Sequence, residues 1–156
     1  GYAGAVAALG FAAHVLEDRL SSLVDTAAEA GQASARLLGR AQELRAQATG
    51  THVPIDPTRA SRTLTRAVTG QMAAYGRDPL RPALERTTSL LALAEATGLS
   101  VLEDGAVQQA FWEFLRGLAP ALIADEQDDA ALRADLLDLG EALGFARPAL
   151  EACLPA

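Results

Sequence analysis

The feature of this chain that most constrains its fold is an apolar heptad pattern that begins at the second residue. Apolar residues follow one another by alternating steps of four and three, and Ser34 is the single polar member. The positions are Tyr2, Val6, Leu9, Ala13, Leu16, Leu20, Leu23, Ala27, Ala30, Ser34, Leu37, Ala41, Leu44 and Ala48. A strict 3.5-residue spacing makes one narrow apolar stripe, which must pack against another helix. The pattern predicts a long helix over residues 2–48.

The first sixteen residues carry no formal charge when His14 is neutral, so a truncated N-terminal membrane span is an alternative. A span needs about 20 apolar residues, whereas the heptad pattern continues through the charged residues 17–19. A signal peptide would have a basic start and a cleavage site, and neither is evident. We therefore expect this segment to pack in water.

Gly31 is the weak point of the predicted long helix, because glycine costs about 1 kcal/mol relative to alanine in a helix interior. In one alternative the helix bends at Gly31 and closes a compact bundle. In the other it stays straight for about 70 Å and projects, and its stripe then needs a partner chain. The interface candidates on this stripe are Leu9, Leu16, Leu20 and Leu23.

Start and stop signals divide the rest of the chain into further helices. Asp-Pro pairs at 56–57 and 78–79 are typical of helix starts. Ser100 and Glu103 have the spacing of a capping box, and Pro120 predicts a kink. The expected helices span about 56–75, 79–97, 101–124 and 126–143, with a short last turn over 148–153. The prediction is an all-α bundle of about five helices that forms a single domain over residues 1–156.

Composition supports this fold class and bounds the function. Half of the 156 residues are hydrophobic but only 4% are aromatic, so the strand-forming residue types are scarce. All basic residues are Arg, which is typical of a GC-rich, bacterial genome. A net charge of −7 disfavours nucleic acid as a partner. Cys153 is the single cysteine, so no internal disulfide forms and a reducing, cytoplasmic compartment is expected.

Charge is distributed unevenly along the chain. Residues 51–86 hold six Arg and three acidic residues, whereas residues 100–141 hold ten acidic residues and two Arg. The two segments pair within the fold, are simply solvated, or make head-to-tail contacts between chains. Arg59, Arg62 and Arg66 share one helix face, which makes them candidates for an anion site.

Residues that could carry catalysis or hold a metal are few. The acidic run 125–129 lacks the Gly and Glu positions of a calcium-binding loop. His14 and His52, the two histidines, lie in different elements with no partner at metal-ligand spacing. No glycine-rich phosphate loop follows a strand. We therefore expect no enzyme activity, no metal and no cofactor.

Two kinds of binding remain open. Trp112 lies beside the main apolar face of its helix, so it either widens the core or serves as an exposed interface anchor. A small apolar or anionic ligand would lie between helices, near Trp112, Met72, Tyr75 and the Arg59–Arg66 face. The leading hypothesis is a non-catalytic bundle that mediates self-association or contact with another helical protein, and ligand binding is the alternative.

Residues 90–145 carry a set of short motifs. They are Leu-x-x-Ala-x-x-x-Gly-Leu-Ser-Val ending at Val101, then Gln108–Arg116 (QQAFWEFLR), Pro120, and Leu139–Gly144 (LGEALG). This third of the chain resembles the helical region that follows the catalytic domain in some bacterial proteins related to family-57 glycoside hydrolases. Gln109 stands where that pattern has Asn, and 104–105 where it has an aromatic residue. The resemblance implies an accessory helical region of a carbohydrate-active protein, with catalysis elsewhere.

Overall fold

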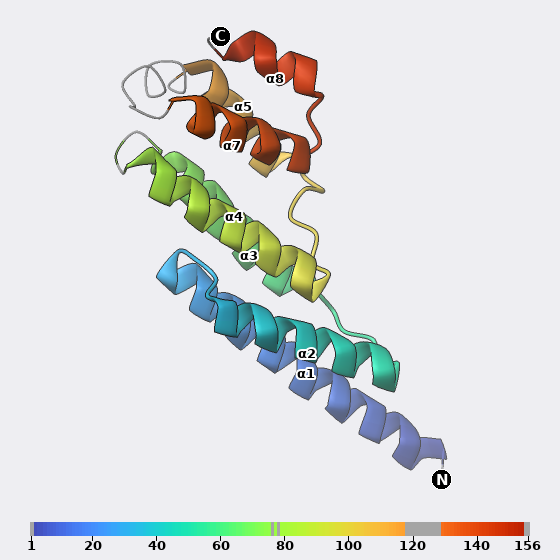
Figure 1. The fold of residues 1–156 in the computed structure, drawn as a ribbon. Helices are drawn as coiled ribbons and strands as arrows, with labels where there is room; N and C mark the ends of the chain where they lie inside the picture. The colour runs from blue at the N-terminus through green and yellow to red at the C-terminus, as the bar shows by residue number, and fades with distance from the viewer. Residues whose placement is uncertain (1, 76, 78, 118–128, 155–156) are drawn as a thin grey trace. The chain divides into compact units, whose positions relative to one another are not determined.

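The computed structural model describes residues 2–75, 77, 79–117 and 129–154. Within those ranges the chain is helical and forms no sheet (Figure 1), which confirms the all-α fold class. The helices are α1 (Tyr2–Ala30), α2 (Ala35–Thr51), α3 (Thr58–Ala73), α4 (Leu80–Thr97), α5 (Ala106–Gly117), α7 (Asp129–Ala142) and α8 (Arg147–Cys153).

The chain divides into two compact units. The first unit comprises residues 1–67 and 89–101, and so contains α1, α2, the start of α3 and the end of α4. The second unit comprises residues 68–88 and 102–156, and so contains the end of α3, the start of α4, α5, α7 and α8. The single domain over residues 1–156 stays a prediction.

One continuous helix over residues 2–48 is a wrong prediction, because the chain reverses after Ala30. Gly31 takes a left-handed φ of 70°, and the N–H of Gln32 donates to the Ala27 carbonyl at 3.2 Å to close the end of α1. Ser34 then caps α2, since its side chain accepts a hydrogen bond from the Leu37 N–H at 3.2 Å. The bend at Gly31 is thus confirmed, and the one polar position of the heptad pattern is a helix cap.

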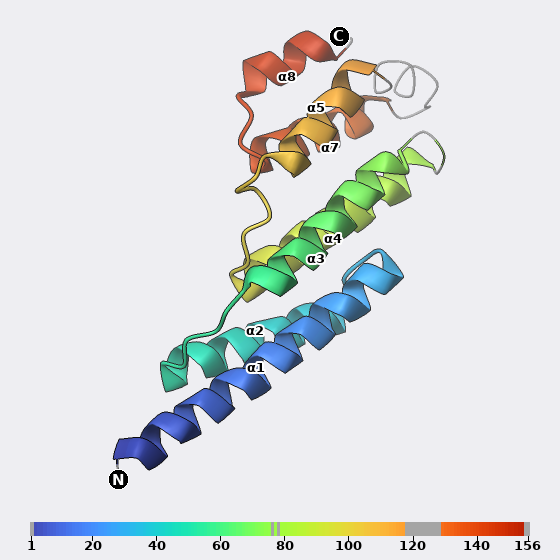
Figure 2. The same cartoon turned by 180° about the vertical axis from the view of Figure 1, so that it is seen from behind.

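The reversal lays α2 alongside α1, with the two helices antiparallel (Figure 2). Five residues of the heptad stripe on these two helices are buried: Leu16, Leu20, Ala27, Ala41 and Leu44. Val24 is buried with them. At these five residues the heptad stripe is therefore covered inside the first unit, where α1 and α2 pack together.

Three hydrogen bonds tie α1 and α2 to the other parts of the first unit. The N–H of Ala33 donates to Ser89 Oγ at 3.0 Å, Arg45 Nη1 donates to the Glu95 carbonyl at 3.0 Å, and the N–H of Asp56 donates to Glu17 Oε1 at 2.9 Å. They hold the turn after α1, the middle of α2 and the segment before α3 respectively.

The start of α3 follows its sequence signal. The Asp56 carboxylate accepts hydrogen bonds from the hydroxyl of Thr58 at 2.7 Å and from its N–H at 3.0 Å. These bonds lower the pKa of Asp56 below its ordinary value, because they favour the charged carboxylate. Pro57 lies just before the first helical residue, Thr58, so the helix begins about two residues later than predicted. Gly76 and Asp78, the predicted end of this helix and cap of the next, lie outside the described residues.

The helix predicted over 101–124 begins later than the sequence indicated. α5 starts at Ala106, whose N–H donates to Asp104 Oδ1 at 3.1 Å. Gly105 has a φ of 75°, which breaks any helix that would start at the predicted Ser100–Glu103 capping box. Pro120 and the acidic residues 125–128 lie outside the described residues.

The second unit is built around a close approach of α7 and α8. A Cβ atom on Gly140 of α7 would lie 2.6 Å from Leu150 Cδ1 of α8 and 3.1 Å from Phe111 Cε1 of α5. Leu150 and Phe111 are fully buried. The absence of a side chain at Gly140 therefore sets how closely these helices pack.

We expect Gly31→Ala to destabilise the protein by about 1 kcal/mol, because alanine at a left-handed φ is strained. The matched control is Gly39→Ala in α2, where a Cβ meets open space. That change should stabilise by roughly 0.5–1 kcal/mol through helix propensity. Urea unfolding midpoints of the two variants test this, and a stabilised Gly31→Ala variant would contradict the reversal at this residue.

Gly140→Ala should destabilise by about 1–3 kcal/mol, because the new methyl group overlaps Leu150 and Phe111. Gly70→Ala in α3 is the control, since a Cβ there has no neighbour within 4 Å. Thermal melts of both variants give the comparison, and equal melting temperatures would argue against the close approach.

Candidate functional site

The N-terminal segment of α1 (residues 2–13) extends beyond the end of α2. α1 continues past the last turn of α2 in both views (Figures 1 and 2). Leu9 is 51% exposed and Phe11 is 71% exposed. Residues 3–13 consist only of Ala, Gly, Val, Leu and Phe. The segment therefore exposes large apolar side chains to solvent, and no polar side chain lies among them.

A small apolar hollow lies at the base of the N-terminal segment. It has a volume of about 260 Å³, and Phe11, Val15 and Leu16 of α1 line it together with Thr51 and Val53. Its exposed lining is entirely apolar. Phe11 and this hollow were not singled out by the heptad pattern, because Phe11 lies off the stripe. The charge-free composition of residues 3–13 is the signal that could have found Phe11.

The predicted interface leucines divide into two groups. Leu9 is exposed, as an interface residue must be, whereas Leu16 and Leu20 are only 7% and 6% exposed. Leu23 is half-buried. Leu16 and Leu20 are corrected to core residues of the first unit, because the reversal at Gly31 supplies the helix that their stripe needs.

Trp112 lies partly in an aromatic cluster of the second unit. Its ring stacks on Phe145 with a centroid separation of 5.4 Å and an interplanar angle of 14°. The Arg116 guanidinium lies 6.0 Å from the ring centroid, at the outer limit of a cation–π contact. Trp112 is half-buried, so it widens the core on one side and stays accessible on the other.

The residues of the predicted ligand site divide between the two units: Arg59, Arg62 and Arg66 belong to the first, and Met72 and Tyr75 belong to the second. Arg59, Arg62 and Arg66 have exposed side chains on α3, and Arg66 takes part in a further interaction. Met72 and Tyr75 are buried, at 4% and 2% exposure. These two side chains lie in the core of the second unit, and ligand binding at the five residues stays a prediction.

Tyr75 is held tightly within the second unit. Its hydroxyl lies 2.5 Å from Thr87 Oγ1. Thr87 uses its one proton to bond the Ala83 carbonyl at 3.0 Å, so Tyr75 is the donor to Thr87. The ring meets Phe114 edge to face at 4.6 Å. Burial raises the pKa of Tyr75 to about 12, which keeps the hydroxyl protonated.

An ion pair joins the two oppositely charged segments. Arg81 Nη1 lies 3.2 Å from Asp135 Oδ2, which places one Arg of residues 51–86 against an acid of residues 100–141. Arg147 contacts Glu141 at 3.0 Å and Glu151 at 3.3 Å. All of these groups are about half exposed, so each pair contributes at most about 1 kcal/mol. The charge asymmetry is thus partly internal pairing.

The structure adds two observations on metal and membrane sites. In the described ranges, no cluster of three or more His, Cys, Asp or Glu side chains is arranged to hold a metal ion. His14 lies 3.4 Å from Asp18 at the surface of α1. Among the helices of the same ranges, none has the length and apolar character needed to cross a membrane.

Comparison of the chain with protein-family models, with curated proteins and with solved structures finds no match. The resemblance of residues 90–145 to an accessory region of family-57 glycoside hydrolase relatives therefore stays a prediction.

The raised pKa of Tyr75 makes stability depend on alkaline pH. An unfolded tyrosine loses its proton near pH 10, whereas folded Tyr75 keeps it to about 12. The folded state therefore holds the extra proton between these values, and stability should fall by about 2–3 kcal/mol as pH rises from 10 to 12. Tyr75→Phe should lose about 1 kcal/mol at neutral pH but flatten the alkaline decline. Urea titrations across this pH range check both effects, and an unchanged decline in the variant would contradict them.

Proposed function

We propose that the protein is a non-catalytic helical module that self-associates through the N-terminal segment of α1. The observation that carries the proposal is the exposure of Leu9 and Phe11 on a segment with no polar side chain between residues 3 and 13. The occupant of this surface is a second copy of the same chain.

The N-terminal segment is apolar on opposite sides of the helix. Leu9 lies on the heptad stripe, and Phe11, two residues on, is turned from it by about 200°. A helix that is apolar all round is ordinarily buried. The stripe side could be covered by a longer α2, but no single neighbouring helix would cover both sides. This arrangement favours a contact outside the first unit.

Charge favours a second copy as the partner. Two chains of net charge −7 repel one another in general, yet residues 3–13 contribute no charge. Two identical segments can therefore pack about a two-fold axis without placing like charges together. Gly4, Ala8 and Ala5 are exposed small residues that permit close approach of the helices. Leu9 and Phe11 then supply the large side chains of the contact.

The dimer expected from this geometry is weak. The N-terminal segment is about 18 Å long at 1.5 Å per residue, and a standard interface buries about 800 Å² on each partner. A contact along a segment of this length buries less than that area on each partner, so association should be weak and depend on concentration. The apolar hollow beside Phe11 extends the surface available to the partner's side chains.

A bacterial, cytoplasmic setting belongs to the same proposal. Its support is compositional, since every basic residue is Arg and Cys153 is the single cysteine. The continued heptad spacing from Tyr2 through Leu9 supports coiled-coil-like packing of the two segments.

The test is the solution mass, measured by light scattering on a sizing column over a hundredfold concentration range. The wild-type mass should rise from monomer toward dimer as concentration rises. Leu9→Glu and Phe11→Glu should each weaken association at least tenfold, because they place a charge in the apolar contact. Neither should lower the melting temperature of the monomer appreciably, because both side chains are exposed.

Ala73→Glu is the matched control, because Ala73 is an exposed alanine on α3 and the change adds the same charge away from the N-terminal segment. It should associate as the wild type does. A wild-type protein that stays monomeric at the highest concentration would overturn the proposal, as would undiminished association of both charged variants.

A further inference from the structure

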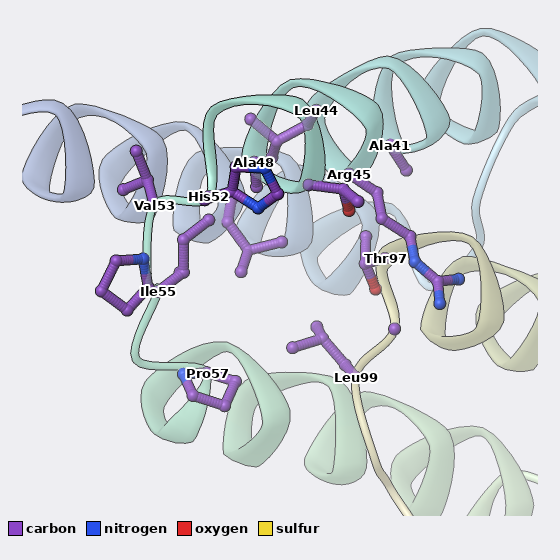
Figure 3. Close-up of a pocket in the computed structure, with 14 residues that line it drawn as sticks. Ala41, Leu44, Arg45, Ala48, His52, Val53, Ile55, Pro57, Thr97 and Leu99 are labelled. Carbon is purple, nitrogen blue, oxygen red and sulfur yellow. The ribbon is translucent and has the colours of Figure 1, made fainter.

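A pocket of about 520 Å³ lies within the first unit (Figure 3). It is surrounded by the last turns of α2, the segment 52–57 and the end of α4. Figure 3 shows His52 and Leu99 on opposite sides of the open space, Arg45 at one end, and Ile55 and Pro57 at the other. Its volume is in the range of small-molecule sites.

Local backbone chemistry keeps this pocket open. His52 takes a left-handed conformation, with φ 54° and ψ 32°, and its N–H caps the last carbonyls of α2. Pro54 and Pro57 cannot extend either neighbouring helix without losing hydrogen bonds. The Glu17 carboxylate holds the N–H of Asp56 at 2.9 Å. The segment 52–57 is thereby fixed beside the pocket rather than folded into it.

The wall of the pocket is mostly apolar. Leu20, Leu44, Val53 and Leu99 line it, and all four are buried residues of the first unit. Ala48 lines it from α2 with only a methyl group. These side chains suit an aliphatic or aromatic body and offer it no hydrogen-bonding group.

The polar groups of the pocket lie at its Arg45 end and at its rim. Arg45 is the one lining residue with a permanent charge. Its Nη1 donates to the Glu95 carbonyl at 3.0 Å, and its guanidinium carbon lies 3.4 Å from the position of a Cβ on Gly98. The end of α4 thus holds the guanidinium in place. A guanidinium has five N–H donors, and this bond uses one of them.

We infer that the pocket binds a small monocarboxylic acid with an apolar chain. The carboxylate would pair with the Arg45 guanidinium, for which a planar two-oxygen anion is the matching partner. The chain would lie over Leu99 and Val53 toward Ile55 and Pro57. His52, the C-cap residue of α2, lines the pocket across from Leu99 and would flank the chain.

This site is distinct from the proposed self-association contact, because neither Leu9 nor Phe11 lines it. Val53 lines both this pocket and the hollow beside Phe11. It also differs from the anion site expected at Arg59, Arg62 and Arg66. Those arginines lie on α3, and none of them lines this pocket.

The test is isothermal titration calorimetry with decanoate on the whole chain, below the concentration at which decanoate forms micelles. Decanoate should bind with one-to-one stoichiometry, and decanol and decyltrimethylammonium should bind at least tenfold more weakly. Arg45→Gln should weaken decanoate binding at least tenfold, because it removes the guanidinium and its charge. Arg40→Gln is the matched control, since Arg40 is exposed on α2 and does not line the pocket.

Ala48→Leu provides a second variant that leaves Arg45 intact. The larger side chain fills the pocket, so it should abolish binding. Leucine also favours helix, so the change should leave α2 folded. Absence of decanoate binding to the wild type would overturn the inference. Equal affinity for decanoate and decyltrimethylammonium would overturn it too, as would undiminished binding by both pocket variants.

Discussion

The pairing of α1 with α2 is the interaction on which the first unit depends. It exists because Gly31 can take a left-handed conformation and Ser34 can cap the helix that follows. The reversal turns a single apolar stripe into two facing stripes, so that Leu20 and Leu44 enter one core. The hydrogen bonds from Ala33 and Arg45 then attach this helix pair to the end of α4. A straight helix would have left the whole stripe without a partner.

Both proposed binding surfaces arise from the unequal lengths of these two helices. α1 has 29 residues and α2 has 17, so the N-terminal segment of α1 has no companion from α2. At the same point the chain must leave α2 and reach α3, and its two prolines keep that segment from packing as a helix. The exposed N-terminal segment and the Arg45 pocket therefore both follow from the early end of α2 at Thr51.

The second unit combines the buried leucines of α7 with small and aromatic residues. Because Gly140 has no side chain, Leu150 and Phe111 both pack closely against it. Phe145 stacks on Trp112. Tyr75 and Thr87 form a polar pair inside this otherwise apolar packing. Because the Tyr75 hydroxyl and Thr87 Oγ1 partner one another and Thr87 also bonds the Ala83 carbonyl, burial of Tyr75 contributes to stability at neutral pH instead of opposing it. The charged residues remain at the surface in ion pairs such as Arg81 with Asp135.

The sequence by itself determined the all-α class, the helix start at Asp56–Pro57 and the weak point at Gly31, because these depend on spacing and local backbone chemistry. It missed the start of α5, where the turn at Gly105 overrode a capping pattern. Only the tertiary structure decided that Leu16, Leu20, Met72 and Tyr75 are core residues while Leu9 and Phe11 are exposed. It also brought Arg45, His52 and Leu99 around one pocket. Burial depends on which segments meet across long sequence separations, and a periodic pattern shows that a face needs a partner without showing which part of the chain supplies it.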